Sequence, residues 1–230
     1  MHAALLPVKS LTNAKARLGA ALSAAERESL TRAMLADMIE ALAATPCLDR
    51  TYVLSSDAAV LRASADLGAE PMHEEDLTQS DPSGRTSSRA QTAIGSLNAA
   101  VAAAAERLVA AGVTRLLTIP GDVPLIEPDE VAAAFQVDAS AYPVVLVPSG
   151  SGAGTNGLLL SPPTVIVPRF EGDSLAAHMD ACRERGVAFR VLALPSFALD
   201  VDTPEDLAEL ARRGGGRRSG RVVTAKRTAA

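Results

Sequence analysis

The sequence has few cysteines and no long apolar segment, and each shortage excludes a class of protein. With only Cys47 and Cys182 in 230 residues, the chain has neither a disulfide scaffold nor the paired Cys/His clusters of a zinc site. No segment approaches the roughly 18 uncharged residues of a membrane span. The N-terminus also lacks a basic segment followed by a long apolar core. We therefore expect a cytoplasmic protein with no membrane partner.

Aromatic residues are also scarce, at 3 % of the chain, so a common signal of a protein–protein interface is missing. The sequence is compatible with a homodimer but carries no feature that requires one. Hydrophobic residues make up 48 % and charged residues 21 %, a balance typical of a folded globular protein. A chain of 230 residues has room for one sizeable α/β domain.

The charge is unevenly distributed between the body of the chain and its C-terminal end. Residues 211–230 contain seven Lys or Arg and no acid, whereas residues 1–210 contain 15 basic and 27 acidic residues. The glycines at 214–216 interrupt a helix, so we predict a folded domain at 1–210 and a basic, disordered tail at 211–230. Nucleic-acid binding is the alternative for this tail. It is not favoured, because interleaved aromatic residues are missing and the acidic body repels phosphate backbones.

Alternating strand and helix patterns indicate an α/β fold. Short apolar runs predict buried strands at 3–8, 50–55, 68–72, 113–119 and 144–147. Apolar residues at helical spacing predict helices at 23–44, 58–67, 97–110 and 128–135. Ser23 and Glu26 form a capping box that sets the start of the first helix. The alternation predicts a mostly parallel central sheet with helices on both faces, in a single Rossmann-like domain.

Two segments interrupt this alternation. Residues 73–93 are polar, rich in Ser and Thr, and show no periodicity. A loop of this length inside a compact domain is usually a functional lid or a mobile insertion, and we predict a polar mobile insertion here. Residues 148–157 include four glycines, so this backbone either approaches a ligand closely or only turns.

Lysine is scarce, and two of the three lysines, Lys9 and Lys15, lie near Arg17 after the first predicted strand. The loop after a strand of an open α/β sheet lies at the carboxyl edge, where such sheets bind ligands. Three cations there could neutralise a triphosphate and stabilise charge on a leaving pyrophosphate. A surface loop whose cations pair with neighbouring acids is the alternative, and the absence of a Walker-type glycine loop leaves both interpretations open.

Carboxylates follow another predicted strand and occupy a later extended segment. Asp122 comes directly after the apolar run at 113–119. Asp200 and Asp202 alternate on an extended segment and so point to one face, just before Thr203, a suitable helix cap. Mg²⁺ prefers one or two carboxylates together with substrate phosphates and water. The acidic segments and the cationic loop together favour magnesium-assisted nucleotidyl transfer, with turn-capping aspartates as the alternative.

Eight segments in order carry a resemblance to a known family, and they span roughly residues 3–210. They are PVKSLTNAKARL at 7–18, the capped helix that follows, LGAE at 67–70, SLNAAV at 96–101, PGDVPLI at 120–126, GTNGLLL at 154–160, FEGDSLAAH at 170–178 and DVDTPEDL at 200–207. The set resembles the guanylyltransferases of deazaflavin coenzyme (F-420) biosynthesis, within the nucleotidyltransferase superfamily. The resemblance implies a fold of the nucleotide-diphospho-sugar transferase type. It also implies GMP transfer from GTP to a small phosphorylated acid, with pyrophosphate released and Mg²⁺ as cofactor.

The resemblance further implies roles for individual residues. Its catalytic, triphosphate-binding cations correspond to Lys9, Lys15 and Arg17. Its nucleotide contacts correspond to Pro7, Val8, Lys9, Ser56, Asp57 and Asn98. Its contacts with the phosphorylated acid correspond to Thr155, Asn156, Gly157, Glu171, Gly172 and Ser174. Its metal-binding acids correspond to Asp122, Asp200 and Asp202, and either of the last two could be the direct ligand.

The segment around Phe170 departs from the family pattern, which usually has Phe-Gly where this sequence has Phe170 followed by Glu171. A carboxylate here repels an anionic acceptor unless it faces a metal or turns away. The acceptor therefore stays open among 2-phospho-L-lactate, phosphoenolpyruvate and 3-phospho-D-glycerate.

Two other functions also stay open. One is a nucleotidyltransferase of another branch, which delivers CMP or GMP to a different phosphorylated acceptor. The other is a non-catalytic nucleotide-binding protein, against which the intact metal acids argue.

Overall fold

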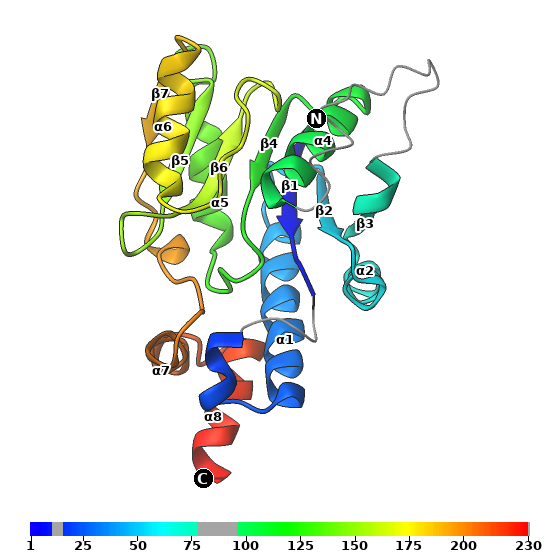
Figure 1. Cartoon of the computed structure of the whole chain (residues 1–230), viewed down its shortest axis with the longest axis vertical. Helices are drawn as coiled ribbons and strands as arrows, with labels where there is room; N and C mark the ends of the chain where they lie inside the picture. The colour runs from blue at the N-terminus through cyan, green and yellow to red at the C-terminus, as the bar shows by residue number, and fades with distance from the viewer. Residues whose placement is uncertain (11–15, 78–95, 230) are drawn as a thin grey trace.

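A seven-stranded sheet forms the centre of the computed structural model, which describes residues 1–10, 16–77 and 96–229 (Figure 1). The spatial order of its strands is β3-β2-β1-β4-β6-β5-β7. The strands are β1 (His2–Pro7), β2 (Arg50–Ser55), β3 (Glu70–His73), β4 (Arg115–Thr118), β5 (Val144–Pro148), β6 (Thr155–Leu160) and β7 (Phe189–Val191). All pairings are parallel except the two that β6 makes with β4 and β5. The predicted, mostly parallel sheet is confirmed.

Helices cover both faces of this sheet, as predicted. The helices are α1 (Ala24–Ala43), α2 (Ala58–Asp66), α4 (Leu97–Ala110), α5 (Pro128–Gln136), α6 (Ser174–Glu184), α7 (Pro204–Arg213) and α8 (Arg218–Ala229), with short 3₁₀ helices η1 (Ala16–Ala20), η2 (Glu74–Leu77) and η3 (Pro195–Phe197). Apolar residues of α1, α2 and α5 pack on one face of the sheet. Those of α4 and α6 pack on the other. The strand interiors are buried on both sides, which explains their continuous apolar runs.

Local sequence signals set several helix ends. Ser23 and Glu26 form the predicted capping box at the start of α1, and Thr203 caps α7 with Pro204 in its first turn. Thr203 forms a second capping box with Asp206, which strengthens that start. The predicted polar insertion at 73–93 lies largely outside the described residues. Its first part, Glu74–Leu77, forms η2.

Strands β6 and β7 were not predicted from the sequence. All six residues of β6 are buried, so its segment, TNGLLL, shows no alternation of polar and apolar residues. Gly157 lies where a Cβ atom would come within 3.0 Å of the Val147 side chain and 3.2 Å of Phe197. The glycine is therefore needed for close packing inside the sheet, whereas the sequence alone suggested a turn or a close approach to a ligand.

The prediction of a disordered tail at 211–230 is wrong for the residues that the structure describes. Helix α7 continues to Arg213, and α8 packs along α1, from Asp37 and Glu40 at its own start to Glu26 near its end, below the sheet in Figure 1. A third apolar cluster joins these helices to η1 and to the segments around Leu125 and Val201. Val223 of α8 is 7 % exposed within it.

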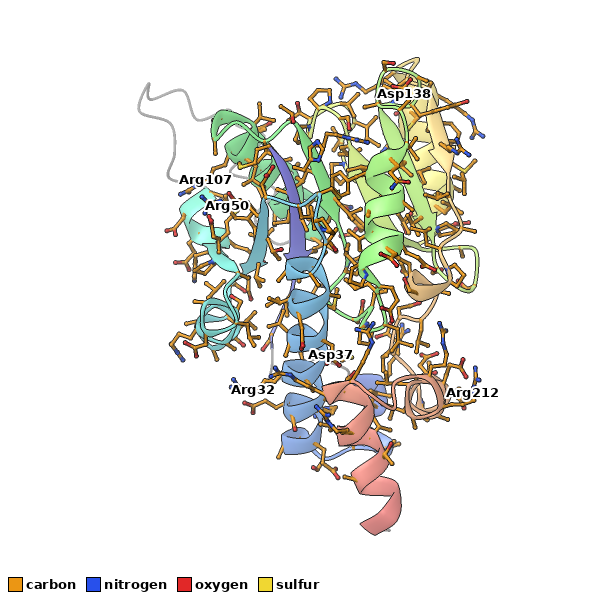
Figure 2. The ribbon with its side chains drawn as sticks, turned by 180° about the vertical axis from the view of Figure 1, so that it is seen from behind. Arg32, Asp37, Arg50, Arg107, Asp138 and Arg212 are labelled. Carbon is orange, nitrogen blue, oxygen red and sulfur yellow. The ribbon has the colours of Figure 1, made fainter. Side chains whose placement is uncertain are left out.

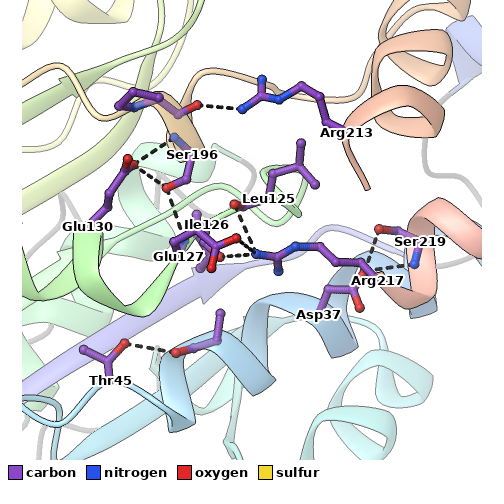
Figure 3. Close-up of polar contacts among 12 residues, drawn as sticks. Asp37, Thr45, Leu125, Ile126, Glu127, Glu130, Ser196, Arg213, Arg217 and Ser219 are labelled. Atoms are coloured by element: carbon purple, nitrogen blue, oxygen red, sulfur yellow. Dashed lines mark hydrogen bonds and ion pairs between the residues drawn. The ribbon is translucent and has the colours of Figure 1, made fainter. Parts of the chain in front are cut away.

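Helix α8 forms at this place because a buried carboxylate, far away in the sequence, binds its first residues. Asp37 of α1, 4 % exposed, accepts hydrogen bonds from the backbone N–H groups of Arg218 and Ser219 at 2.9 and 2.8 Å. It also accepts one from the Ser219 hydroxyl at 2.5 Å (Figure 3). Figure 2 shows Asp37 beside the start of α8. These bonds satisfy N–H groups that a helix start leaves unpaired, so α1 supplies the cap that the local sequence lacks.

Helix α8 is also attached to the segment that follows β4. Arg217 donates hydrogen bonds to the backbone oxygens of Leu125 and Ile126 and forms an ion pair with Glu127 at 2.8 Å (Figure 3). The chain between β4 and α5 is therefore fixed from two sides, by the sheet and by α8.

No helix within the described residues has the length and apolar character needed to cross a bilayer.

Candidate active site

The predicted site segments meet at one edge of the sheet. The carboxyl ends of the parallel strands β1, β2 and β4 lie at this edge, because their registers run side by side. The antiparallel strand β6 begins there, with Thr155 at its first position. This is the edge at which open α/β sheets bind ligands.

The loops after β1 and β4 are in direct contact. The backbone N–H of Gly121 donates to the Pro7 oxygen at 3.3 Å. A Cβ atom on Gly121 would lie only 2.6 Å from Cγ2 of Val8, so this approach requires glycine. The contact places Asp122 beside the start of the cationic loop.

The loop after β1 is also fixed to the start of α2. The Ser10 hydroxyl donates to Asp57 at 3.0 Å, and Asp57 caps α2 by accepting from the Ala59 N–H at 2.8 Å. Asp57, expected as a nucleotide contact, therefore has a structural role in this loop, while Ser56 beside it is exposed.

The predicted catalytic cations are placed as follows. Lys9 lies two residues after the end of β1, and Arg17 lies on η1. Both side chains are exposed, as contact with a triphosphate from solvent requires. Lys15 lies outside the described residues.

The acidic segments converge at the same edge. The backbone N–H of Val201 donates to the backbone oxygen of Asp122 at 3.0 Å. This bond joins the loop after β4 to the chain between Asp200 and Asp202. Asn156 of β6, 4 % exposed, donates to the Phe197 oxygen at 2.7 Å and to Asp200 at 3.4 Å. Asn156 was expected to contact the phosphorylated acid. In the structure it holds the Asp200 segment against the sheet.

The electrostatics of Asp200 show that these carboxylates affect one another. Burial raises the pKa of Asp200 above its usual range, and the negative charges of Asp122 and Asp202 raise it further, against the hydrogen bond from Asn156. These carboxylates offer only oxygen atoms as ligands, which suits a hard divalent cation such as Mg²⁺. Within residues 1–10, 16–77 and 96–229, however, no three Asp, Glu, His or Cys side chains group closely enough to hold a metal by themselves.

The start of β6 is linked to the start of α6, where the phosphorylated acid was expected to bind. The Thr155 N–H donates to the Ser174 hydroxyl oxygen at 2.8 Å, and each residue is 3 % exposed. Gly172 has a φ of 64°, a left-handed conformation that lets the chain turn into α6. Its neighbour Glu171 is exposed.

Two further polar side chains fix the segment before α6. The Asn98 side-chain oxygen accepts from the Phe170 N–H at 2.6 Å, although Asn98 was expected to contact the nucleotide. His178 is fully buried, with Nδ1 3.0 Å from the Thr155 hydroxyl and Nε2 accepting from the Arg169 N–H at 2.8 Å. Sequence reasoning missed this role of His178. The available signal was its position one helical turn after Ser174, on the same face of α6.

Comparison with solved structures gives the class of protein to which this fold belongs. A protein of Desulfovibrio desulfuricans G20 named as a nucleotide-diphospho-sugar transferase superposes with a TM-score of 0.75 and 18 % identity, covering 99 % of this chain and 95 % of that one. Glucosyl-3-phosphoglycerate synthase of Mycobacterium tuberculosis, solved with Mn²⁺ and uridine-diphosphate-glucose, gives a TM-score of 0.58 at 11 % identity, covering 93 % of this chain and 79 % of that one. At these identities the likeness establishes the fold, which is that of the nucleotide-diphospho-sugar transferases.

The sequence comparisons then identify the family. A family model described as "Guanylyl transferase CofC like" matches residues 2–84 and 85–225, a range that includes most of α8. The chain belongs to this family of nucleotidyltransferases.

Three relatives illustrate the activities named in this group. A phosphoenolpyruvate guanylyltransferase of Rubrobacter xylanophilus is 38 % identical, over 92 % of this chain and 94 % of the relative. A 2-phospho-L-lactate guanylyltransferase of Methanothermobacter thermautotrophicus is 36 % identical, over 93 % of this chain and 85 % of the relative. A 3-phospho-D-glycerate guanylyltransferase of Phenylobacterium zucineum is 33 % identical, over 97 % of this chain and 96 % of the relative.

Proposed function

We propose that this protein transfers GMP from GTP to a small phosphorylated three-carbon acid, releasing pyrophosphate, in the biosynthesis of coenzyme F-420. The observation that carries the proposal is the meeting of the loops after β1 and β4 with the Asp200 segment at one edge of the sheet. Family membership and the three relatives, which act on chemically similar acids, support the reaction class. Both substrates are highly charged and do not cross bilayers unaided, so we place the reaction in the cytoplasm.

The proposed chemistry is a single displacement at the α-phosphorus of GTP. A phosphate oxygen of the acid attacks this phosphorus, a new P–O bond forms, and the bond to the bridging oxygen of the leaving pyrophosphate breaks. The attacking oxygen is already ionised at neutral pH, so no strong general base is needed. The protein contributes alignment of the substrates and neutralisation of their charge.

In this proposal, the two sides of the site have different tasks. Lys9, Lys15 and Arg17 contact the triphosphate and neutralise charge as the pyrophosphate leaves. Asp122 and Asp200, with Asp202, would hold Mg²⁺. The ion when bound supplies further positive charge at the phosphates.

The acid is placed at the start of α6. The N-terminal end of a helix carries partial positive charge and attracts anions, and α6 begins beside Thr155 and Gly172. The Asp173 side chain makes no capping hydrogen bond at this helix start. Glu171 is exposed next to this place, so its charge would act on the choice of acceptor.

The test is a panel in which pyrophosphate release is measured for each of the four nucleoside triphosphates with each of the three acids. We expect release with GTP and at least one acid, and release with the other nucleotides lower by about tenfold or more. Release with CTP in preference to GTP would favour a nucleotidyltransferase of another branch. Tight GTP binding without turnover on any acid would favour a nucleotide-binding protein.

A further inference from the structure

His178 is a buried polar side chain whose two ring nitrogens both face polar groups of the expected acceptor site. It is fully buried, and its hydrogen-bond partners include the Thr155 hydroxyl, the backbone N–H of Arg169 and the backbone of Ser174. The ring of Phe170 packs edge-on against it, with centroids 5.0 Å apart and planes inclined by 76°. An apolar residue could fill this space but would leave the hydroxyl and the N–H without these partners, at a cost in free energy.

The direction of these hydrogen bonds follows from the chemistry of the groups. A backbone N–H can only donate, so Nε2 accepts from Arg169. Burial lowers the pKa of His178 to about 4, so the ring is neutral near pH 7 and carries its proton on Nδ1. Nδ1 therefore acts as a donor, and it faces both the Thr155 hydroxyl oxygen and the backbone of Ser174 one turn earlier in α6.

The same reasoning applies to Ser174, whose hydroxyl oxygen accepts from the Thr155 N–H. Each of the two hydroxyl groups thus has its oxygen engaged by a protein donor. Neither of these hydrogen bonds uses the proton of the hydroxyl group itself. Two hydroxyl donors beside the start of a helix are suited to a carboxylate or phosphate group.

His178 also fixes the backbone before α6 together with Asn98. The consecutive N–H groups of Arg169 and Phe170 donate to His178 and to Asn98, respectively. These two acceptors lie on α6 and α4, so the segment is held between two helices of the same face.

We propose that His178 is a positioning residue for the phosphorylated acid. It sets the Thr155 hydroxyl as a donor toward the acid and holds the segment at 169–174 in the conformation that the acid contacts. The inference rests on the proposed function, because it takes the start of β6 and α6 as the place where the acid binds.

The test uses three substitutions that divide the two hydrogen bonds. His178→Phe keeps the volume of the ring and removes both bonds. His178→Asn places an amide nitrogen near the position of Nδ1 and keeps a donor for Thr155. His178→Gln places an amide oxygen near the position of Nε2 and keeps an acceptor for the Arg169 N–H.

The matched control is His2→Phe. His2 is at the start of β1, at the opposite edge of the sheet, and its ring stacks on Phe135 at 5.1 Å. It shares the type of change but not the site, so we expect the KM values of both substrates to stay at their wild-type level.

The readout is the KM of each substrate, measured by pyrophosphate release with the acid that the wild-type protein uses best. In His178→Phe we expect the KM of the acid to rise about tenfold and the KM of GTP to change by less than about twofold. His178→Asn should recover most of the affinity for the acid. Adding Thr155→Val to His178→Phe should cause little further loss, since both changes remove one interaction.

Three results would overturn the inference. The first is an equal rise in both KM values, and the second is a lower melting temperature with unchanged KM values, as expected of a residue that only packs. The third result is a KM for the acid that is as high in His178→Asn as in His178→Gln. This comparison also decides the question if His178→Phe does not fold. A wild-type protein that uses none of the acids contradicts the proposed function itself, before any substitution is made, and removes this inference with it.

Discussion

Three aspartates, Asp122, Asp200 and Asp202, concentrate negative charge at the edge of the sheet where the loops after β1 and β4 meet. Burial first, and then the negative charges of Asp122 and Asp202, raise the pKa of Asp200, so the ionised form of this carboxyl carries an electrostatic cost. Residues kept at such a cost are more often functional than structural.

The substitution Asp122→Asn tests this interpretation. It keeps the size of the side chain and the backbone hydrogen bond to Val201, so the fold should be retained. We expect kcat to fall by about 100-fold or more, because charge neutralisation at the phosphates is lost. Asp66→Asn, at the exposed C-terminal end of α2, is the control and should keep wild-type turnover. Near-normal turnover in Asp122→Asn would reject the role of this carboxylate.

The burial of a second single residue, His178, predicts that the free energy of unfolding depends on pH. Its pKa is about 4 in the folded protein, against 6.5 for an ordinary histidine, first because of burial and also because of the nearby positive charge of Arg169. The unfolded chain therefore binds a proton that the folded protein does not, and stability is lost as the pH falls from about 6.5 to about 4. The loss is on the order of 3 kcal/mol.

Urea unfolding of the wild-type protein and of His178→Asn between pH 7 and pH 4.5 measures this contribution. The free energy of unfolding should fall less steeply with decreasing pH in the variant, which has no group to titrate. Identical slopes for the two proteins would show that His178 does not titrate as its burial requires.

Single residues also show what the sequence could and could not predict. The sequence pattern predicted Asp122 at the carboxyl edge of the sheet, because the carboxyl ends of parallel strands meet there. Asp200 follows no strand, and contacts with Asp122 and Asn156 bring its segment to the same edge. The contacts of Asn98 and Asn156 were not predictable. Each binds a segment more than 40 residues away in the sequence, and that proximity exists only after folding.

At the scale of elements, the helices and strands with a local signal were predicted, and those fixed by distant contacts were not. The capping boxes of α1 and α7 are complete within four residues and could be read directly. Strand β6 has no polar face, since it is buried on both sides and pairs with two neighbours. Helix α8 takes its cap from Asp37, 181 residues away from Arg218.

The substitution Asp37→Asn tests whether this distant cap holds α8 in place. An amide at this position cannot accept all three hydrogen bonds that the carboxylate accepts, and Asp37 is buried. We expect the free energy of unfolding in urea to fall by about 2 kcal/mol.

Glu40→Gln is the matched control on the next turn of the same helix. The Glu40 side chain is 71 % exposed and forms an ion pair with Arg218 at 3.7 Å, so its loss should cost less than about 1 kcal/mol. An Asp37→Asn protein as stable as this control would show that α8 does not depend on the cap.

At the scale of the whole molecule, α8 and the start of α1 pack together below the sheet and support the segments of the site (Figure 1). The Lys226 ammonium group donates to the Ala21 oxygen and forms an ion pair with Glu26 at 3.1 Å, which joins α8 to the start of α1. The third apolar cluster connects these helices with Leu125 and Val201, next to the acidic segments. The basic C-terminal residues, expected to be a separate tail, are part of the framework that positions the carboxylates.

The central claim is that this framework serves transfer of GMP to a phosphorylated acid. Mass spectrometry of the products formed from GTP and an equal mixture of 2-phospho-L-lactate, phosphoenolpyruvate and 3-phospho-D-glycerate tests it most directly. We predict a guanosine-diphosphate-linked acid formed from at least one of the three by the wild-type protein, and far less of it with Asp122→Asn. A wild-type protein that leaves GTP and all three acids unchanged, in the presence of Mg²⁺, would contradict the account.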